Sequence, residues 1–580
     1  MNQEEMNNLE GAPEEEARIE PAAPAEDSGS APSEGGSKPP GFPKNVATAA
    51  WDAVLKRREL LQTLAGIPVV GWLAWRALRK VDIEGDRRQQ LVEELGDLQN
   101  APAVLPELSD ASGDLIRLGI IGSGGEGRHL LRCAGFVPTE TTDGWRRALE
   151  RNPRNNALSD FLNQPDLKVE LTAVCDVFDV HAELAMDAAT NPDRPGGRTP
   201  MGAVRHRHYQ DLLRDPHVDA VIIATPDHWH ARMIVDAAAE GKPVYVEKAM
   251  TRTEQEAHDV YRAVTEAGIA FQLGHQNRQI ESHEKARQII EQGLLGPINL
   301  VETTTNRNSP NGAWVYNIHE EANAQTIDWD QFQEPAPNKV PFSAERYHRW
   351  RCWFDYGTGL SGDLFSHEYD SVNQILGMGI PATVSASGGI YYYKMDEIHK
   401  YHDPERYPMT EDRDVPDVFH IACEYPDRNM TLLYSSTLSN GHGRGMKFMG
   451  HDATMEVGGG LTIYAESEST RYRQKIRRRV IDTSLPLFTW QQGAEGFDAV
   501  TSASDQYFIS RGLLYTYRGG VRVPTNTPHI AEWLDAIRNG GETSCNIERG
   551  FEEAITCHMA TRSYLEGRRV SWDPVSRRIV

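Results

Sequence analysis

The sequence predicts an α/β protein. We expect an N-terminal, doubly wound parallel sheet and a C-terminal α+β domain whose strands have one exposed face. Two patterns support this prediction. After residue 114, short apolar runs alternate with helical segments, as in a parallel sheet with crossover helices. After residue 279, the runs instead alternate apolar and polar residues, which is typical of strands with one exposed face.

Composition excludes several classes of protein. The chain has 580 residues, with 60 basic and 84 acidic side chains and a net charge of −24. A protein whose main partner is nucleic acid needs a basic binding surface, so we expect no nucleic-acid partner. A mean hydropathy of −0.54 excludes a multi-span membrane protein. The six cysteines lack C-x-x-C spacing, which favours buried free thiols over a disulfide framework or a zinc ribbon.

The first 113 residues divide into three segments. Residues 1–50 are predicted to be a disordered, acidic, Pro-rich tail, because residues 1–40 hold ten acidic and two basic side chains. In residues 51–80, Arg57-Arg58 precede an apolar run that ends at Trp75, which resembles a twin-arginine signal. We expect twin-arginine export or a membrane tether through residues 57–76, and otherwise a cytoplasmic protein. The alternative is a buried or interfacial amphipathic helix. Residues 81–113 are predicted to form a helix and a linker.

A glycine-rich turn follows the first predicted strand, Leu115–Ile121. The G-x-G-x-x-G spacing between a strand and a helix indicates dinucleotide binding. Gly122 permits the tight turn, Gly124 lets the backbone approach a pyrophosphate, and Gly127 lets the helix pack on the strand. The positive end of the helix dipole then faces the phosphates. The predicted binding turn comprises Gly122, Ser123, Gly124, Gly125, Glu126 and Gly127.

An acidic residue, Asp176, ends the second predicted strand, Val169–Cys175. A carboxylate at this point binds ribose hydroxyls and repels a 2′-phosphate, so the sequence favours NAD over NADP. The alternative for Asp176 is a turn or helix-cap acid. Asp176 lies much farther from Gly127 than the usual separation of about 20 residues. Residues 135–166 are therefore predicted to be a surface insertion.

Two further strands end in polar motifs. Val218–Ala224 runs into Thr225-Pro226 and His230, and Val244–Val246 runs into Glu247-Lys248-Ala249. Together with the glycine-rich turn and Phe271–Arg278, these motifs resemble the Gfo/Idh/MocA family of NAD(P)-dependent oxidoreductases. That family usually has a proline at the position of Ala249. The resemblance covers about residues 115–580 and implies a Rossmann domain over 114–278. It adds cofactor-binding candidates, namely Thr225, Pro226, His230, Glu247, Lys248 and Gln276.

The chemical centre follows a second glycine-rich stretch. Asp363 and His367 are four residues apart, so a helix would place both on one face. The resemblance implies that they form the active-site set with Lys248. A histidine can accept a hydroxyl proton near neutral pH, and a lysine ammonium can stabilise developing alkoxide charge. Taken singly, these residues could be a solvated lysine, a helix cap and a structural histidine.

Three neighbouring features have less specific interpretations. We interpret Asp370 as structural. His228 and His230 lack a third clustered ligand, so no metal site is predicted. Aromatic residues between Asn306 and Trp350 could stack on sugar rings or pack in the core. They are Trp314, Tyr316, Trp329 and Trp350.

The resemblance implies that residues 279–526 form the substrate and oligomerisation domain. It also implies a large, open-faced, mainly antiparallel sheet in this domain, with homo-oligomers forming through the open face. Residues 527–580 are predicted to be helices and an extended tail that pack back on the core. The resemblance implies hydride transfer between a nicotinamide and a sugar, inositol or polyol-type substrate. Two alternatives remain open. One is an NAD-dependent glycosidase that works by oxidation, elimination, hydration and reduction, and the other is a non-catalytic binding protein on the same fold.

Overall fold

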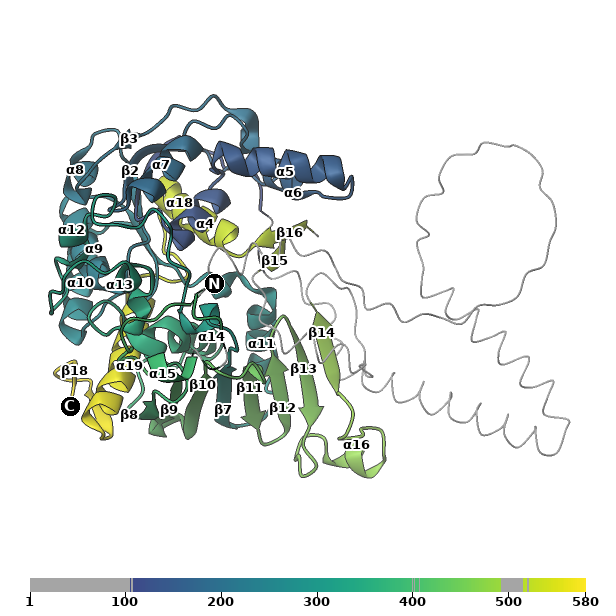
Figure 1. The fold of residues 1–580 in the computed structure, drawn as a ribbon. Helices are drawn as coiled ribbons and strands as arrows, with labels where there is room; N and C mark the ends of the chain where they lie inside the picture. Colours follow the sequence, from purple (N-terminus) through teal and green to yellow (C-terminus); the bar gives the residue numbers. More distant parts are fainter. Residues whose placement is uncertain are drawn as a thin grey trace, which may run out of the picture. The chain divides into compact units, whose positions relative to one another are not determined.

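The computed structural model describes residues 105, 108–398, 400, 402–405, 407–491, 515–518 and 521–580 (Figure 1). The segments predicted over 1–50 and 51–80, and most of 81–113, lie outside these residues. Within the described part of the chain, no helix is both long enough and apolar enough to span a membrane.

The first domain contains a six-stranded, wholly parallel sheet in the order β3-β2-β1-β4-β5-β6. This confirms the doubly wound prediction. The strand order reverses between β1 and β4, which is where such folds open a crevice for ligands. The strands are β1 (Ile116–Ile121), β2 (Val169–Cys175), β3 (Val204–Arg205), β4 (Ala220–Ile223), β5 (Val244–Val246) and β6 (Phe271–Leu273).

Helices cover the parallel sheet, and most strand residues are buried on both faces. Such strands read as continuous apolar runs rather than alternating ones, which explains their clear signal in the sequence. The helices of this domain include α4 (Gly125–Cys133), α7 (Asp179–Ala188), α8 (Tyr209–Arg214), α9 (Asp227–Ala239) and α10 (Glu254–Ala267). Thr253 and Glu256 form a capping box that fixes the start of α10.

The predicted insertion folds as two helices between α4 and β2. They are α5 (Thr139–Arg151) and α6 (Ala157–Leu162). Val137, Trp145 and Phe161 form a small hydrophobic cluster of their own. The segment is therefore a packed helical extension of the connection between α4 and β2.

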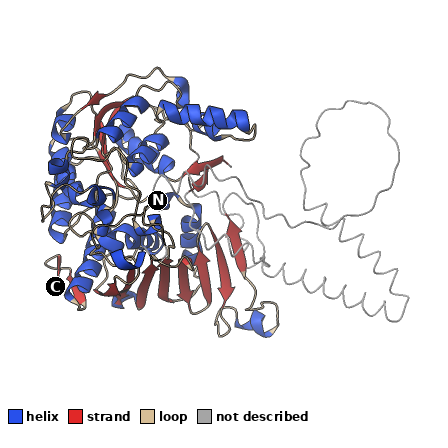
Figure 2. Ribbon diagram, viewed as in Figure 1, coloured by secondary structure: helices blue, strands red, loops and turns tan. Residues whose placement is uncertain are grey.

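The second domain contains a ten-stranded sheet in the order β14-β13-β12-β11-β7-β10-β9-β8-β17-β18 (Figure 2). Only the β7–β10 pair is parallel, which confirms a mainly antiparallel sheet. Helices α11 (Glu281–Glu291) and α19 (Ile547–Glu566) contact its strands, and α14 (Ser366–Leu376) packs on both of these helices. The strands are β7 (Ile298–Thr305), β8 (Thr383–Gly389), β9 (Val418–Tyr425), β10 (Met430–Thr437), β11 (Arg444–Gly450), β12 (Ala453–Val457), β13 (Gly460–Ala465), β14 (Phe488–Gln491), β17 (Val570–Asp573) and β18 (Arg578–Ile579).

The C-terminal helices return to the rest of the molecule. Helix α18 (Asn526–Asn539) inserts Ile530, Trp533 and Leu534 into the core of the parallel sheet. The predicted extended tail instead forms β17 and β18, and β17 pairs with β8. The remaining short elements are α12 (Trp329–Gln333), α13 (Ala344–His348), α15 (Met395–Ile398), α16 (Arg473–Arg477), and the hairpin β15 (Tyr515–Arg518) and β16 (Val521–Pro524).

Candidate active site

A cavity of about 500 Å³ lies where the carboxyl ends of the parallel strands meet the loops of the second domain. Its size falls within the usual range for a small-molecule or cofactor site. The glycine-rich turn lines one end, and Lys248, Asp363 and His367 line the other. Other lining residues include Asp176, Thr225, Pro226, Glu247, Gln276, Arg307, Trp314, Tyr316, Trp350 and Arg351.

The glycine-rich turn forms a cradle that fits a pyrophosphate. Gly122 has a φ of +85°, and a Cβ on Gly127 would lie 2.1 Å from the Gly122 carbonyl oxygen, so both positions require glycine. A Cβ on Gly125 would meet nothing within 4 Å and would instead occupy open space. Helix α4 begins here without a side-chain cap, so its first N–H groups are available to an anion. The turn can therefore hold the phosphates of a dinucleotide.

Asp176 lies at the end of β2 and lines the cavity, as predicted for a ribose-binding carboxylate. It accepts hydrogen bonds from the Ser123 N–H (2.6 Å), the Ser123 hydroxyl (3.1 Å) and the Phe178 N–H (2.8 Å). Burial raises the pKa of Asp176, and these hydrogen bonds oppose that rise. Ser123 is fully buried, so it orients Asp176 and does not line the cavity.

His230 differs from its predicted role as a cofactor ligand. Its ring is fully buried and does not line the cavity. Nδ1 lies 2.7 Å from the Ala249 carbonyl oxygen, and Nε2 lies 2.7 Å from that of Thr225. His230 therefore links the loop after β4 to the loop that carries Lys248. The Lys248–Ala249 peptide bond in that second loop is cis.

Glu247 faces the cofactor end of the cavity next to Glu126. Burial, followed by the charge of Glu126, raises the pKa of Glu247 to about 8. Its Oε1 atom has no hydrogen-bond partner within the described residues. A mostly protonated carboxyl at neutral pH adds little negative charge where a dinucleotide brings its own.

Lys248, Asp363 and His367 come together at the inner end of the cavity. Lys248 Nζ donates to Asp363 Oδ1 at 2.7 Å, and Arg351 Nε donates to the same oxygen at 2.8 Å. Trp314 Nε1 donates to Asp363 Oδ2 at 2.9 Å. Burial raises the pKa of Asp363, but the charges of Lys248 and Arg351 outweigh it and hold that pKa well below its usual range. Asp363 is thus an ionised anchor that fixes the lysine.

The pKa of His367 differs from that of a histidine that titrates near neutral pH. Burial, followed by the charge of Lys248, holds the pKa of His367 well below its ordinary value. The neutral ring is therefore ready to accept a proton. Its Nδ1 atom has no hydrogen-bond partner in the described part of the chain, and the ring packs edge-on against His275 at 5.3 Å.

The backbone around Asp363 is not the α-helix that the spacing predicts. Ser361–Phe365 form one π-helical turn, which leads directly into α14. Both Asp363 and His367 still line the cavity. π-helical turns occur frequently at functional sites.

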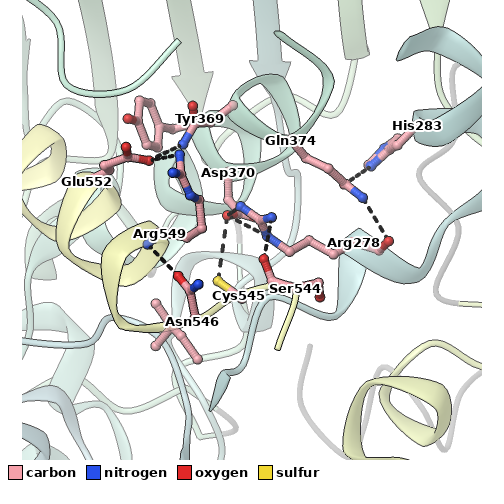
Figure 3. A network of polar contacts seen from close by, with 12 residues as sticks. Arg278, His283, Tyr369, Asp370, Gln374, Ser544, Cys545, Asn546, Arg549 and Glu552 are labelled. Carbon is pink, nitrogen blue, oxygen red and sulfur yellow. Dashed lines mark hydrogen bonds and ion pairs between the residues drawn. The ribbon is translucent and has the colours of Figure 1, made fainter. Parts of the chain in front are cut away.

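Asp370 holds α14 in place and has the structural role that the sequence suggested (Figure 3). Arg278 Nη2 donates to Asp370 Oδ1 at 2.6 Å, and both side chains are almost wholly buried. Arg278 Nη1 also donates to the Ser544 carbonyl at 2.7 Å. This network ties the helix that carries His367 to the end of the first domain and to the loop between α18 and α19.

Some side chains of the site were not identified from the sequence. Arg351 and Arg307 line the cavity, and neither belongs to a recognisable motif. Among the four aromatic candidates, Trp314, Tyr316 and Trp350 line the cavity, whereas Trp329 packs on Phe332 with ring centroids 5.0 Å apart.

His228 and the cysteines lie in structural environments. His228 Nε2 lies 2.8 Å from the Phe332 carbonyl oxygen, inside the core. In the described ranges, no cluster of three or more His, Cys, Asp or Glu side chains is placed to hold a metal ion. The six cysteines are buried and free.

Comparisons with known proteins agree with this architecture. Residues 147–275 match a family described as "Oxidoreductase family, NAD-binding Rossmann fold", and residues 287–572 match its "C-terminal alpha/beta domain". A solved structure, levoglucosan dehydrogenase in complex with NADH and levoglucosan, covers 79% of this chain and 99% of its own chain. It superposes with a TM-score of 0.50 at 18% identity, which supports the fold.

Two curated relatives have named activities. The scyllo-inositol 2-dehydrogenase (NAD(+)) of Bacillus subtilis (strain 168) is 34% identical over 18% of this chain and 31% of its own length. The 2,7-anhydro-N-acetylneuraminate hydratase of Escherichia coli (strain K12) is 28% identical over 31% of this chain and 38% of its own length. The chain spans half or less of the length of the first curated relatives it matches. Both domains nevertheless match, and the chain belongs to the Gfo/Idh/MocA family of NAD-binding oxidoreductases.

Proposed function

We propose that this protein is an NAD-dependent dehydrogenase that oxidises a secondary hydroxyl of a sugar, inositol or polyol-type substrate. One observation carries the proposal: Lys248, Asp363 and His367 gather at the inner end of a cavity that begins at the glycine-rich turn. The named activities of the scyllo-inositol and levoglucosan dehydrogenases support the substrate class.

Each polar group at the inner end has a distinct task. Lys248, held by Asp363, donates a hydrogen bond to the substrate hydroxyl oxygen and stabilises negative charge as it develops. His367, kept neutral by burial and by Lys248, accepts the hydroxyl proton. A nicotinamide cofactor held at the glycine-rich turn would supply the hydride acceptor for the carbon that bears this hydroxyl. Asp363 stays ionised and keeps Lys248 in place.

The choice of NAD over NADP is part of the proposal. Asp176 lies where a ribose would bind, and its carboxylate would repel a 2′-phosphate. Titration of the protein with NADH and NADPH tests this choice, and we expect NADH to bind more tightly. The substitution Asp176→Ser should reduce the difference between the affinities for NADH and NADPH. Tighter binding of NADPH by the unaltered protein would contradict the assignment.

A redox-assisted reaction without net oxidation is the second candidate. The Escherichia coli relative is named a hydratase, and an enzyme that oxidises, eliminates, adds water and reduces needs the same cavity. A screen of sugars and inositols with NAD, followed by nicotinamide absorbance, separates the two. A dehydrogenase accumulates NADH in proportion to product, whereas the alternative forms product without net NADH.

If no sugar or inositol in the screen gives product by either route, the catalytic proposal fails. The protein would then be a binding protein on this fold. The matched control for the substrate screen is the variant His367→Asn, which should still bind NADH but form no product.

We also propose twin-arginine export or a membrane tether for the segment around Arg57-Arg58, which lies outside the described residues. Cell fractionation of the protein with Arg57→Lys and Arg58→Lys, beside the unaltered protein, is the test. Wholly cytoplasmic protein in both cases would contradict the proposal.

A further inference from the structure

The substrate end of the cavity holds more positive than negative charge. Lys248, Arg307 and Arg351 line the cavity with the Asp363 carboxylate, and the adjacent Glu247 carboxyl has a pKa that burial raises to about 8. Asp227 lies behind them, where it accepts hydrogen bonds from the Thr358 N–H and hydroxyl. Even if Asp227 is counted as fully ionised, the cations outnumber the carboxylates. A partly buried excess charge calls for a counter-charge from the ligand.

Both arginines have N–H donors that no described residue accepts from. Arg351 donates through Nε to Asp363, and its guanidinium lies over the Trp350 ring at 4.1 Å. Within the described residues, its two Nη groups have no acceptor, and the side chain is 24% exposed. Arg307 makes one long contact, from Nη1 to the Gly312 carbonyl at 3.4 Å, and forms no ion pair with a described carboxylate.

These donors match one chemical group better than others. A guanidinium presents a planar fork of N–H groups that fits the two oxygens of a carboxylate. A carboxylate brings one negative charge, and the alkoxide that develops at Lys248 brings a second. A phosphate brings nearly two charges by itself and is usually bound by a helix N-terminus or a glycine-rich turn. In this cavity, that device lies at the opposite, cofactor end.

We propose that the substrate is an acidic sugar, of the uronate, aldonate or sialate class, whose carboxylate binds Arg307 and Arg351. This inference rests on the proposed function, because it places the reacting hydroxyl at Lys248 and His367. Trp350 and Tyr316 also line the cavity and add aromatic surface against which a sugar can pack. Arg307 takes no part in anchoring Lys248. We therefore assign it the task of selecting acidic over neutral sugars.

The test is binding to the NADH-loaded protein, measured by titration calorimetry, with turnover measured separately. The probes are a panel of uronates, aldonates and N-acetylneuraminate, each beside its neutral counterpart, and hexose 6-phosphates as the phosphate arm. We expect at least one acid to bind ten-fold or more tightly than its neutral counterpart. Arg307→Met should remove that preference and leave the affinity for the neutral sugar within about two-fold. Arg307→Lys should restore part of it.

The matched control is a second variant that has the same net charge as Arg307→Met but an unchanged cavity. Arg473 is exposed on α16, so Arg473→Met should retain the preference for the acid. The proposal is overturned if no acid binds more tightly than its neutral counterpart, if a hexose phosphate binds most tightly, or if Arg307→Met keeps the preference. If an acid binds through Arg307 but no NADH forms and no product appears, the carboxylate site stands and the proposed catalytic function fails.

Discussion

At the scale of single residues, Asp363 organises the site through one oxygen. Its Oδ1 atom accepts from both Lys248 and Arg351, so the lysine is fixed before any substrate binds. We expect Lys248→Met to lower turnover by on the order of 10²-fold or more, because a preorganised charge beside a developing alkoxide contributes about 3 kcal/mol. NADH binding should change little, since the glycine-rich turn holds the phosphates. Steady-state kinetics and NADH titration measure the two effects, and near-normal turnover would refute the assignment.

The pKa of His367 determines how the rate of this reaction is expected to depend on pH. Burial and the Lys248 charge lower the folded-state pKa of His367, so the ring stays unprotonated below pH 6.5, and activity is lost only at lower pH. Removing the neighbouring cation makes protonation easier and raises that pKa. In Lys248→Met, the acid limb of the residual kcat/KM should therefore move upward toward 6.5. An acid limb that stays in place would show that another group titrates.

The sequence could identify Lys248, Asp363 and His367 because each lies in a local motif with fixed spacing. It could not identify Arg351 or Trp314 as partners of Asp363, because their role arises from loops that fold over the cavity. His230 shows the opposite error. Its position after β4 suggested a ligand, whereas packing turns its ring toward two main-chain carbonyls.

At the scale of elements, buried parallel strands were the easiest to predict. β2 has the predicted bounds, Val169–Cys175, because a strand buried on both faces reads as an unbroken apolar run. The π-helical turn over Ser361–Phe365 gave no such signal. A Cβ on Gly362 in this turn would lie 2.0 Å from Thr358 Oγ1 and 3.1 Å from Ala249 Cβ, so the turn packs closely against its surroundings. Periodicity alone therefore predicted an α-helix.

The Arg278–Asp370 pair fixes the helix that carries His367, and its loss should be costly (Figure 3). Arg278→Met leaves the Asp370 carboxylate buried without its partner, which should lower the free energy of unfolding by about 3–5 kcal/mol. Arg549→Met provides the comparison, because the Arg549–Glu552 pair is partly exposed and should contribute less than about 1 kcal/mol. Denaturant unfolding of both variants measures the difference. Equal losses would mean that Arg278 does not anchor α14.

At the scale of the whole molecule, charge is distributed unevenly. The chain carries a net charge of −24, whereas the cations Lys248, Arg307 and Arg351 line its cavity beside the Asp363 carboxylate. Acidic surfaces keep a protein soluble, but they also repel anionic ligands at long range. At an ionic strength of 0.1 M, this repulsion between the surface and the ligand is largely screened beyond about 10 Å. The positive cavity is therefore a local property of the loops, which the overall composition does not reveal.

The open face of the ten-stranded sheet leads to a prediction about assembly. Strands β7, β9 and β10 alternate buried and more exposed residues, and the outer side bears a hollow of about 560 Å³ lined by residues such as Thr304, His420 and Leu433. Leu433 is 36% exposed at its centre. We propose that a second copy of the chain covers this face, because a regular sheet surface that exposes apolar side chains such as Leu433 among small polar ones can pack against an identical surface.

Placing a charge at the centre of that interface should separate the copies. Leu433→Asp would bury two like charges near the symmetry axis, so we expect oligomers of the unaltered protein to dissociate, as measured by light scattering after size exclusion. The monomers should still bind NADH, because the cavity lies on the other side of the helices that contact this sheet. As a control, Leu565→Asp changes an exposed leucine on α19, away from the face, and should leave the oligomer intact. If the unaltered protein is monomeric, or if Leu433→Asp leaves its oligomer unchanged, the face is not the interface.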